Sequence, residues 1–522
     1  MSEARNSLLT VDRDSLRKRY AFKVGAAVLG TPFGLVVQFL CSRTLGPVGY
    51  GSYSFINGFF TEVMTFLDAG TSAGFYAKLC ARPNERELVV FYWRLVGVIA
   101  IFLSGLIALV FLLGFGLRVW PNQRPAYVSL GAMGAFSVWV AGVVGRAVDA
   151  YGLTVIGEKV RLAQRVILAL LVVVAAAVGV LSLANFFLIQ WLAAIILALG
   201  GAWVLWQGGH AVYPRVALRR AATVRYVREF WAYSHPLITY ATAGLLAGLS
   251  DRWTLQRFGG NVEQGFFGLA TQLGAACFLV TSTFVPLLGR EFSRAHAMVE
   301  RDGIRRIFDQ QAKRFFTLTC IIAVFVACNA SDIARVVGGA QFAGAAPALA
   351  LMCLGPIHQS YGQINGALFL ATGETQAYRN IGVILLCVGI PINLLLVGPA
   401  RYGGLDLGAT GLAIKVTLLQ CVGVNVQLYW IANRLQLSFR RLFWQQIYTI
   451  SILLAIGLAA LLLARHADQA LTRLAISGAC YSLLVLFLSW GAPRVLSIPV
   501  MAWLGEGWNR AFSAMKRKAN SI

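Results

Sequence analysis

The residues with the greatest potential for chemistry are charged side chains within long apolar stretches. Glu62 and Asp68 lie in one such stretch, Asp251 and Arg252 lie near the end of another, and Lys415 lies about 10 Å of helix inside a third. A charge in the hydrocarbon core of a membrane costs several kcal/mol unless it is paired or hydrated. Charges at such depth therefore indicate a functional site, with Glu62 and Lys415 the strongest candidates.

The alternative interpretation of these charges is structural. Asp251 would pair with a neighbouring arginine, and Lys415 with an acidic residue across a helix contact. Lys23 and Arg146 lie at the ends of apolar stretches, where long basic side chains extend toward lipid headgroups. For these two the structural interpretation is the stronger one.

The stretches that carry these residues predict an all-α polytopic membrane protein. The chain is 58% hydrophobic and 13% charged, about half the charged fraction of soluble domains. A transmembrane helix needs roughly 20 apolar residues. The sequence predicts about fourteen spans, at 22–42, 53–77, 95–117, 127–148, 166–183, 186–207, 237–255, 266–289, 315–330, 346–372, 381–397, 408–432, 447–464 and 474–491.

The distribution of basic residues predicts the orientation. With the N-terminus inside, 35 of the 45 Lys and Arg residues fall on the inner side, nine fall on the outer side, and Lys415 lies within a span. This asymmetry follows the positive-inside rule and places both termini in the cytoplasm. It also explains the net charge of +24, although an anionic substrate is a second interpretation.

An internal repeat predicts two parallel six-span lobes. The loop after the first span and the loop after the seventh align without gaps at an offset of 214 residues, which pairs Arg43 with Arg257, Gly46 with Gly260, and Gly51 with Gly265. We expect a tight hairpin at each site, with glycine in the turn and arginine anchoring the helix end, rather than direct substrate contact. The expected organisation is an N-lobe at 1–207, a cytoplasmic linker at 208–236, a C-lobe at 237–432, and two further spans with a basic cytoplasmic tail at 433–522.

The loop motif and three later stretches carry a resemblance to a known family. The motif Arg-x-Leu-Gly-Pro-x-x-Tyr-Gly-x-Tyr at 43–53 resembles the first loop of polysaccharide exporters of the multidrug/oligosaccharidyl-lipid/polysaccharide (MOP) superfamily. Similar stretches follow at 236–270, at 365–375 and at 393–413, in the same order as in the family. The closest branch is the Wzx-type flippases, with twelve to fourteen spans in two six-span lobes. Lys415 departs from the pattern, since such proteins usually carry small residues at this point.

The resemblance implies a lipid-linked oligosaccharide as cargo. Its diphosphate head would bind basic side chains, for which the candidates are Lys415, Arg252, Arg146 and Lys23. The carboxylates Glu62, Asp68 and Asp251 are the candidates for coupling transport to an ion gradient. Polar residues in spans, such as Gln38, Asn365 and Asn393, would bind sugar hydroxyls or form hydrogen bonds between helices.

The implied function is flipping of an undecaprenyl-diphosphate-linked oligosaccharide to the periplasmic leaflet of the bacterial inner membrane, for O-antigen or exopolysaccharide assembly. The implied partners are membrane lipids, a polysaccharide polymerase and export machinery, with no nucleic acid. Two alternatives within the superfamily are a lipid II-type flippase and a multidrug antiporter. A membrane polymerase or glycosyltransferase is disfavoured by the short outer loops, and the sequence contains no nucleotide-binding or hydrolase motif. We therefore expect no catalytic residue, metal or cofactor.

Overall fold

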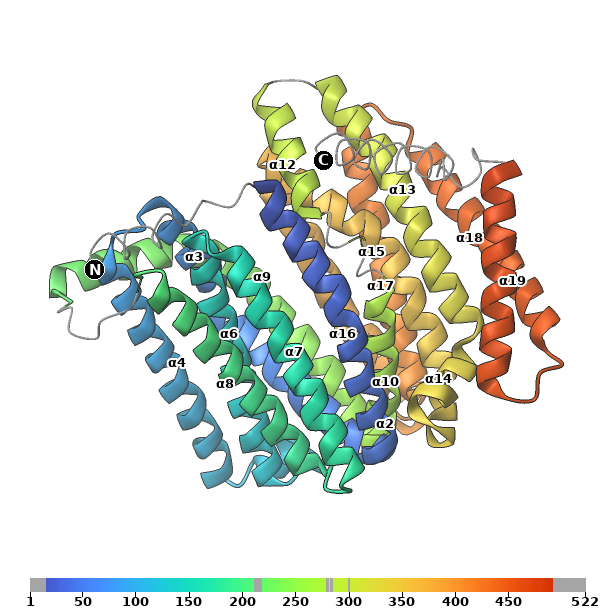
Figure 1. The fold of residues 1–522 in the computed structure, drawn as a ribbon, viewed down its shortest axis with the longest axis horizontal. Coiled ribbons are helices and arrows are strands. Elements are labelled where there is room, and N and C mark those ends of the chain that lie inside the picture. The colour runs from blue at the N-terminus through green and yellow to red at the C-terminus, as the bar shows by residue number, and fades with distance from the viewer. Residues whose placement is uncertain (1–15, 211–217, 278–280, 282–284, 299–300, 492–522) are drawn as a thin grey trace, which may run out of the picture. The chain divides into compact units, whose positions relative to one another are not determined.

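The computed structural model of the protein describes residues 16–491, except 211–217, 278–280, 282–284 and 299–300. Every regular element within these residues is helical (Figure 1), as the apolar stretches predict, because a lipid environment requires each backbone polar group to bond within its own segment. The expected basic tail after residue 491 lies outside the described residues.

Contacts divide the chain into two compact units. Unit 1 comprises Met1–Gly268, Val337–Gln341 and Gly382–Leu412, and unit 2 comprises Leu269–Val336, Phe342–Ile381 and Ala413–Ile522. Unit 1 thus includes segments that the sequence assigned to the C-lobe. The division into two parallel lobes at the expected boundaries stays a prediction.

The helices of unit 1 begin with one long element that contains the first two expected spans. The following list gives their bounds: α2 (Leu16–Asp68), α3 (Thr71–Ala81), α4 (Arg86–Leu112), α5 (Gly116–Val119), α6 (Pro125–Ala150), α7 (Thr154–Ala177), α8 (Leu183–Gln207), α9 (Arg220–Thr254), the π-helix η1 (Leu255–Gly259) and the start of α10 (Gly260–Ala276). α2 packs against α6, α7 and α9, and α6 packs against α8.

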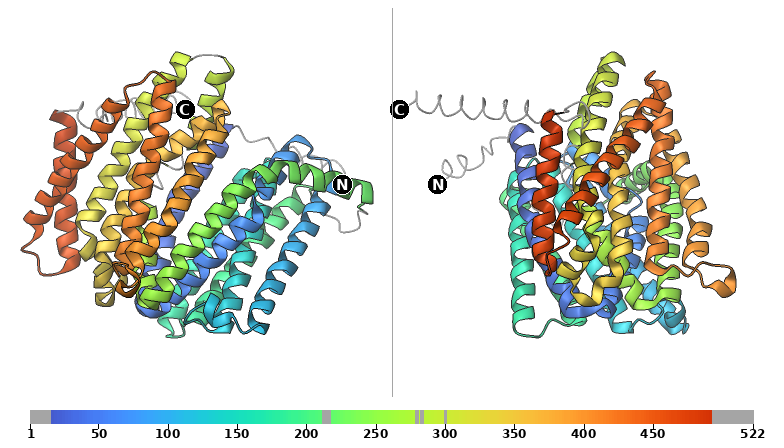
Figure 2. Two further views of the ribbon diagram at one scale, coloured as in Figure 1. Left: turned by 180° about the vertical axis from the view of Figure 1, so that it is seen from behind. Right: turned by 90° about the vertical axis from the view of Figure 1, so that its right-hand side faces the viewer.

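Unit 2 consists of a second set of helices. The remaining elements along the chain are α12 (Val285–Ala297), α13 (Arg301–Cys328), α14 (Ala330–Gly338), the 3₁₀ helix η2 (Ala340–Ala345), α15 (Ala346–Thr372), α16 (Thr375–Val397), the 3₁₀ helix η3 (Ala400–Tyr402), α17 (Gly408–Arg434), α18 (Phe439–Ala464) and α19 (Ala470–Gly491). Parts of α14, η2, α16 and α17 belong to unit 1, and η3 lies entirely within unit 1. α15 packs against α12 and α13. α18 and α19 form a hairpin, seen side by side in Figures 1 and 2.

Eleven helices in the described residues are long and apolar enough to span a membrane. The first, Gly25–Asp68, contains two of the expected spans, because α2 changes direction at Gly46. α9 covers the seventh expected span and α10 covers the first part of the eighth, up to Ala276. Neither is among the eleven, and α10 has only 17 residues. The chain is therefore a multi-pass membrane protein, and the fold class predicted from sequence is confirmed.

α9 joins the linker expected at 208–236 to the seventh expected span. It begins at Arg220 and continues without interruption to Thr254, so the described part of the linker beyond Arg220 and the span are one helix. The physical reason is packing. Tyr226 and Phe230 are buried against Phe91, with ring centroids 5.3 and 5.5 Å from it, so this apolar face is covered by protein rather than by lipid. The cytoplasmic position of the linker stays a prediction.

Candidate functional site

The two repeated hairpins of unit 1 adopt the same backbone conformation. Gly46 has φ 65° and ψ 177°, and its repeat partner Gly260 has φ 75° and ψ −169°. Residues with a Cβ strongly disfavour this region, so glycine is needed where each helix reverses direction. The predicted structural equivalence of the two loops is confirmed at this position.

The two hairpins also pack against each other through the second glycine of each motif. A Cβ on Gly51 would overlap the carbonyl group of Asn261 and lie 2.8 Å from the backbone nitrogen of Gly265. A Cβ on Gly265 would in turn overlap the carbonyl group of Pro47. Each motif therefore needs its glycine because the backbone of the other motif occupies the space.

The arginines of the motif lie away from this contact. Arg43 and Arg257 are both exposed, and the Arg43 guanidinium lies 4.4 Å from the ring centroid of Phe39 on its own helix. The Arg43 carbonyl accepts a hydrogen bond from Gln341 at 3.2 Å. This exposure supports the expected role as anchors of the helix ends.

Two helices of unit 1 bring together three of the charged residues singled out in the sequence. α2 carries Glu62, and the end of α9 carries Asp251 and Arg252. All three are half-buried, and both carboxylates are close enough to interact electrostatically with the Arg252 guanidinium. The sequence predicted the importance of each residue but not that they form one cluster.

Two glycines make room for this cluster in a reciprocal way. Gly58 of α2 faces Arg252, whose Nε lies 2.6 Å from where a Cβ would be. Gly248 of α9 faces Glu62, whose Cδ lies 2.6 Å from the equivalent position. The sequence analysis missed both glycines, because their role depends on a contact between residues almost 200 positions apart. The only signal in the sequence was spacing, because Gly58 precedes Glu62 and Gly248 precedes Arg252 by one helical turn each.

Additional contacts fix the Arg252 side chain. Its Nη1 lies 3.4 Å from the carbonyl oxygen and 3.3 Å from the hydroxyl of Ser54, and its guanidinium lies 5.7 Å from the Phe267 ring centroid. The Arg252 carbonyl accepts a hydrogen bond from Gln264 at 2.6 Å. These contacts hold the Arg252 guanidinium against Ser54 of α2 and Phe267 of α10.

Asp68 lies apart from this cluster and caps a helix. Its carboxylate accepts hydrogen bonds from the Ser72 backbone N–H and hydroxyl, at 3.0 and 2.7 Å, and from the Trp139 indole at 3.1 Å. Arg146 approaches it to 4.0 Å. These contacts give Asp68 a structural role at the start of α3, and its expected part in ion coupling stays a prediction.

The remaining basic candidates lie elsewhere. Lys23 forms an ion pair with Asp149 at 3.2 Å, between the start of α2 and the end of α6. Lys415 lies in α17 and is only 5% exposed, so protein covers its side chain, while its depth in the membrane stays a prediction. It belongs to unit 2, whereas Arg252 belongs to unit 1, so a site shared by the two stays a prediction.

Several polar residues within spans form hydrogen bonds between helical segments. Gln38 donates to the Tyr50 hydroxyl at 2.7 Å, Asn393 to the Ser250 carbonyl at 3.2 Å, and Asn365 to the Val424 carbonyl at 3.3 Å. These contacts favour the structural interpretation of the three residues over sugar binding.

One end of unit 1 carries an ion-pair network that the sequence did not predict. Glu229 of α9 accepts from Lys78 at 2.9 Å and from Arg82 at 2.6 Å, both at the end of α3. Hydrogen bonds from Arg82 and then Lys78 lower the pKa of Glu229 to about 2. Glu85 continues the network to Arg225 at 2.6 Å.

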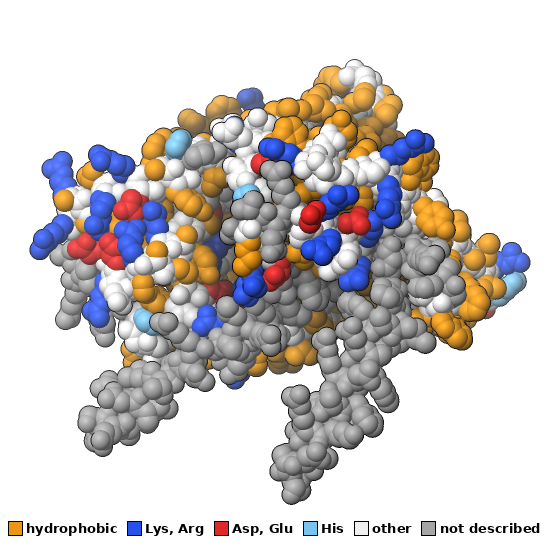
Figure 3. Space-filling view, turned by 90° about the horizontal axis from the view of Figure 1, so that it is seen from above, with side chains coloured by type: hydrophobic (Ala, Val, Ile, Leu, Met, Phe, Trp, Pro, Cys, Tyr) orange, Lys and Arg blue, Asp and Glu red, His pale blue; other side chains and the backbone are white. Residues whose placement is uncertain are grey.

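The network joins segments that the predicted topology places on the same side of the membrane. Lys and Arg side chains, accompanied by Asp and Glu, gather on the face shown in Figure 3. In unit 1 the ion pair of Lys23 with Asp149 joins α2 to α6, and that of Lys78 with Glu229 joins α3 to α9, as the predicted topology requires; the sidedness itself stays a prediction.

Comparisons with known proteins agree with this architecture. A family model described as "Polysaccharide biosynthesis protein" matches residues 16–288, just over half of the chain. The fold is similar to that of "Lipid II flippase MurJ, inward closed conformation", with a TM-score of 0.67, 12% identity, and coverage of 91% of this chain and 99% of that one.

Two further similarities are to an inward-facing multidrug resistance MATE family transporter of the MOP superfamily and to a MOP superfamily transporter from Pyrococcus furiosus. The first has a TM-score of 0.53 and 15% identity, and the match covers 83% of this chain and 97% of that one. The second has a TM-score of 0.53 and 14% identity, and the match covers 80% of this chain and 96% of that one. No curated protein sequence matches the chain. At these identities the structural similarity establishes the fold alone.

Proposed function

Because the chain belongs to the polysaccharide biosynthesis protein family of the MOP exporter superfamily, we propose that it is a flippase for an undecaprenyl-diphosphate-linked oligosaccharide. It moves the cargo from the cytoplasmic to the periplasmic leaflet by alternating access. The observation that supports this most is the cluster of Arg252 with Glu62 and Asp251, in a fold shared with a lipid-linked substrate flippase.

The cluster suggests how a diphosphate would be bound and released. The planar guanidinium of Arg252 donates two parallel hydrogen bonds to phosphate oxygens and replaces part of their hydration. Glu62 competes for the same guanidinium when it is ionised. Protonation of Glu62 frees Arg252 for the cargo, and loss of the proton favours release, which couples the two events.

Lys415 is the second proposed contact for the diphosphate, with Lys23 and Arg146 as entry residues nearer the helix ends. We expect Lys415→Ala to abolish export while the protein still inserts. Combined removal of Lys415 and Glu62 distinguishes transport from structure. A double variant that regains export would show that Lys415 serves only to pair with Glu62.

The direct experiment compares two arginines five residues apart. Arg252→Gln removes the charge in the cluster, whereas Arg257→Gln removes an exposed charge in the hairpin. In a strain lacking the protein, surface polysaccharide export should be lost with Arg252→Gln and kept with Arg257→Gln, at equal membrane levels. Export at the normal rate with Arg252→Gln would exclude the proposed binding role.

The similarity to MurJ supports a second candidate, a lipid II-type flippase. Both cargoes carry a diphosphate on a polyprenyl tail, so the Arg252 cluster suits either. Growth rescue of a strain depleted of its lipid II flippase would favour this second function, and lack of rescue together with restored polysaccharide export would favour the first.

The proposal places the protein in the bacterial inner membrane with both termini in the cytoplasm. Its partners are the lipid-linked cargo, membrane lipids and the polymerase that receives the flipped oligosaccharide. The family and the fold are those of transporters, and we propose that the chain itself catalyses no covalent step.

A further inference from the structure

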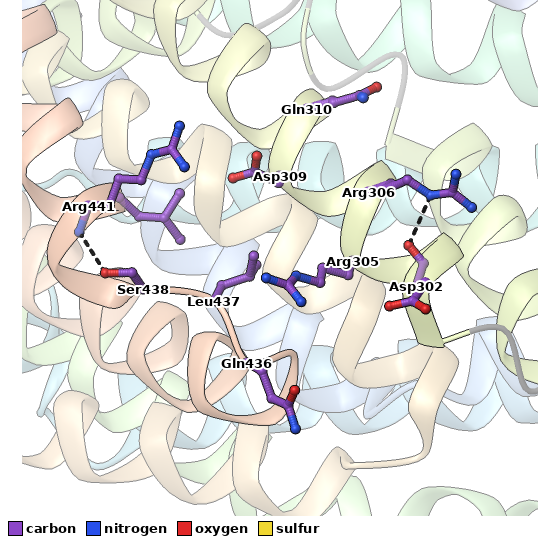
Figure 4. Close-up of a pocket in the computed structure, with 10 residues that line it drawn as sticks. Asp302, Arg305, Arg306, Asp309, Gln310, Gln436, Leu437, Ser438 and Arg441 are labelled. Atoms are coloured by element: carbon purple, nitrogen blue, oxygen red, sulfur yellow. Dashed lines mark hydrogen bonds between the residues drawn. The ribbon is translucent and has the colours of Figure 1, made fainter.

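Unit 2 contains a polar pocket of about 730 Å³ that is separate from the proposed translocation residues. It lies between the first turns of α13 and the connection from α17 to α18. Figure 4 shows Arg305 extending from α13 toward Leu437 of that connection, and Arg441 extending from the first turn of α18. The two arginines thus approach the pocket from different helices.

Three arginines and Asp302 line the pocket, so positive charge exceeds negative charge there. Asp309 also lines it, but its carboxylate is paired with Lys313 at 2.6 Å. Arg306 turns back and donates to the Asp302 carbonyl at 3.3 Å. Among the residues that the structure describes, Arg305 and Arg441 form ion pairs with no carboxylate. Two exposed guanidinium groups and the hydroxyl and amide groups of Ser438 and Gln436 form a suitable environment for phosphate oxygens.

The helix that carries Arg441 continues into an apolar surface. Trp444 follows Arg441 by three residues and Tyr448 follows Trp444 by four, so all three lie on one face of α18. Trp444 is 56% exposed and Tyr448 50% exposed. Exposed aromatic side chains next to basic ones are typical of the level where lipid headgroups meet the hydrocarbon core.

We infer that this pocket binds the phosphate of an anionic phospholipid headgroup, with the acyl chains along the Trp444 and Tyr448 face of α18. The basic pocket continues into the apolar face, and this favours a lipid over free phosphate, because inorganic phosphate would contact only the basic pocket. The site is independent of the proposed flippase activity, so either conclusion can fail without the other.

The test uses the full-length protein in detergent and compares neighbouring arginines on the same helix. Arg441→Gln and Arg305→Gln each remove one guanidinium from the pocket. Arg440→Gln is the matched control, because Arg440 is exposed and precedes Arg441 but does not line the pocket. Native mass spectrometry titrates each protein with phosphatidylglycerol and, separately, with zwitterionic phosphatidylcholine.

We expect phosphatidylglycerol to bind about tenfold more weakly to the Arg441→Gln and Arg305→Gln variants, since each loses a charge-assisted hydrogen bond, and normally to Arg440→Gln. Trp444→Ala should also weaken phosphatidylglycerol binding, because the acyl chains lose their contact with the indole ring. Arg441→Lys, which keeps the charge, should retain part of the affinity and also tests the site if the glutamine variants do not fold.

Equal binding of phosphatidylglycerol to all the arginine variants would overturn the inference, as would phosphatidylcholine binding with the same affinity. Inorganic phosphate that binds as tightly as the lipid would overturn it too, because the pocket would then be a site for a free anion.

Discussion

Replacing Gly51 with alanine tests the packing between the two repeated hairpins. The new Cβ would lie 2.7 Å from the carbonyl carbon of Asn261, whereas nonbonded carbons approach to about 3.5–4.0 Å. The two backbones must therefore move apart by about 1 Å. Because the obstacle is backbone on both sides, no side-chain rotation relieves it.

The expected cost is at the upper end of the range for overpacking, about 3 kcal/mol. For a chain of 522 residues such a loss corresponds to a fall in melting temperature of about 3 °C. The measurement is thermal unfolding of the purified protein in detergent. Gly142→Ala is the matched control, because Gly142 lies in helix α6 and a Cβ there would have no neighbouring atom within 4 Å. Alanine at this position should stabilise the helix by up to about 1 kcal/mol.

The repeat provides a second check on the same contact. Gly265→Ala should also destabilise, because its Cβ would lie 3.1 Å from the carbonyl carbon of Pro47. The double variant Gly51→Ala/Gly265→Ala should lose less than the sum of the two, since one separation relieves both overlaps. An unchanged melting temperature for Gly51→Ala, or strictly additive losses, would refute the interlocked arrangement.

Three further predictions concern ion pairs and topology. The lowered pKa of Glu229 means that its contribution is fully present above pH 4.5 and is lost as the pH falls through about 2. Glu229→Gln should therefore differ from the wild type in melting temperature at pH 6, and the difference should shrink below pH 4.5 and vanish only at about pH 2. Asp332 and Arg473 form a two-point ion pair, with both nitrogen–oxygen distances 2.6 Å and Asp332 only 5% exposed. Asp332→Ala should cost about 3 kcal/mol and the added change Arg473→Met should restore much of it, whereas additive losses in a double-mutant cycle would show that the pair is not coupled. Reporter fusions after Ile522 should be cytoplasmic and those within 118–125 periplasmic, and a periplasmic C-terminus would contradict the predicted number of spans.

The sequence was sufficient for features that recur at fixed spacing. Apolar stretches of membrane-spanning length predicted the all-helical fold, and the motif at 43–53 predicted the superfamily, which the family match confirms. The offset of 214 residues predicted the equivalence of Gly46 and Gly260, whose backbone angles agree. Such features are local, or repeat within the chain, so no knowledge of contacts is needed to find them.

Features that depend on contacts between distant segments were not predicted. Lys78 and Glu229 are 151 residues apart. In the sequence Lys78 resembles an ordinary positive-inside loop charge, and Glu229 resembles an ordinary exposed acid among basic residues. The roles of Gly58 and Gly248 likewise appear only once α2 and α9 are placed together. The continuity of α9 was missed because the charged residues of 220–236 resembled a membrane-surface segment, whereas burial of Tyr226 and Phe230 keeps this segment in the helix bundle.

The contact between the hairpins also has a consequence for biogenesis. The first hairpin leaves the ribosome about 214 residues before the second, which at 5–20 residues per second is on the order of 10 to 40 s. During this interval the helix face around Gly51 lacks the segment at 261–265 that later packs against it. The amino-terminal helices must therefore be held in the membrane in an unfinished state until residues 260–265 are inserted. Chains that stall before this point would be expected to be substrates for membrane quality-control proteases.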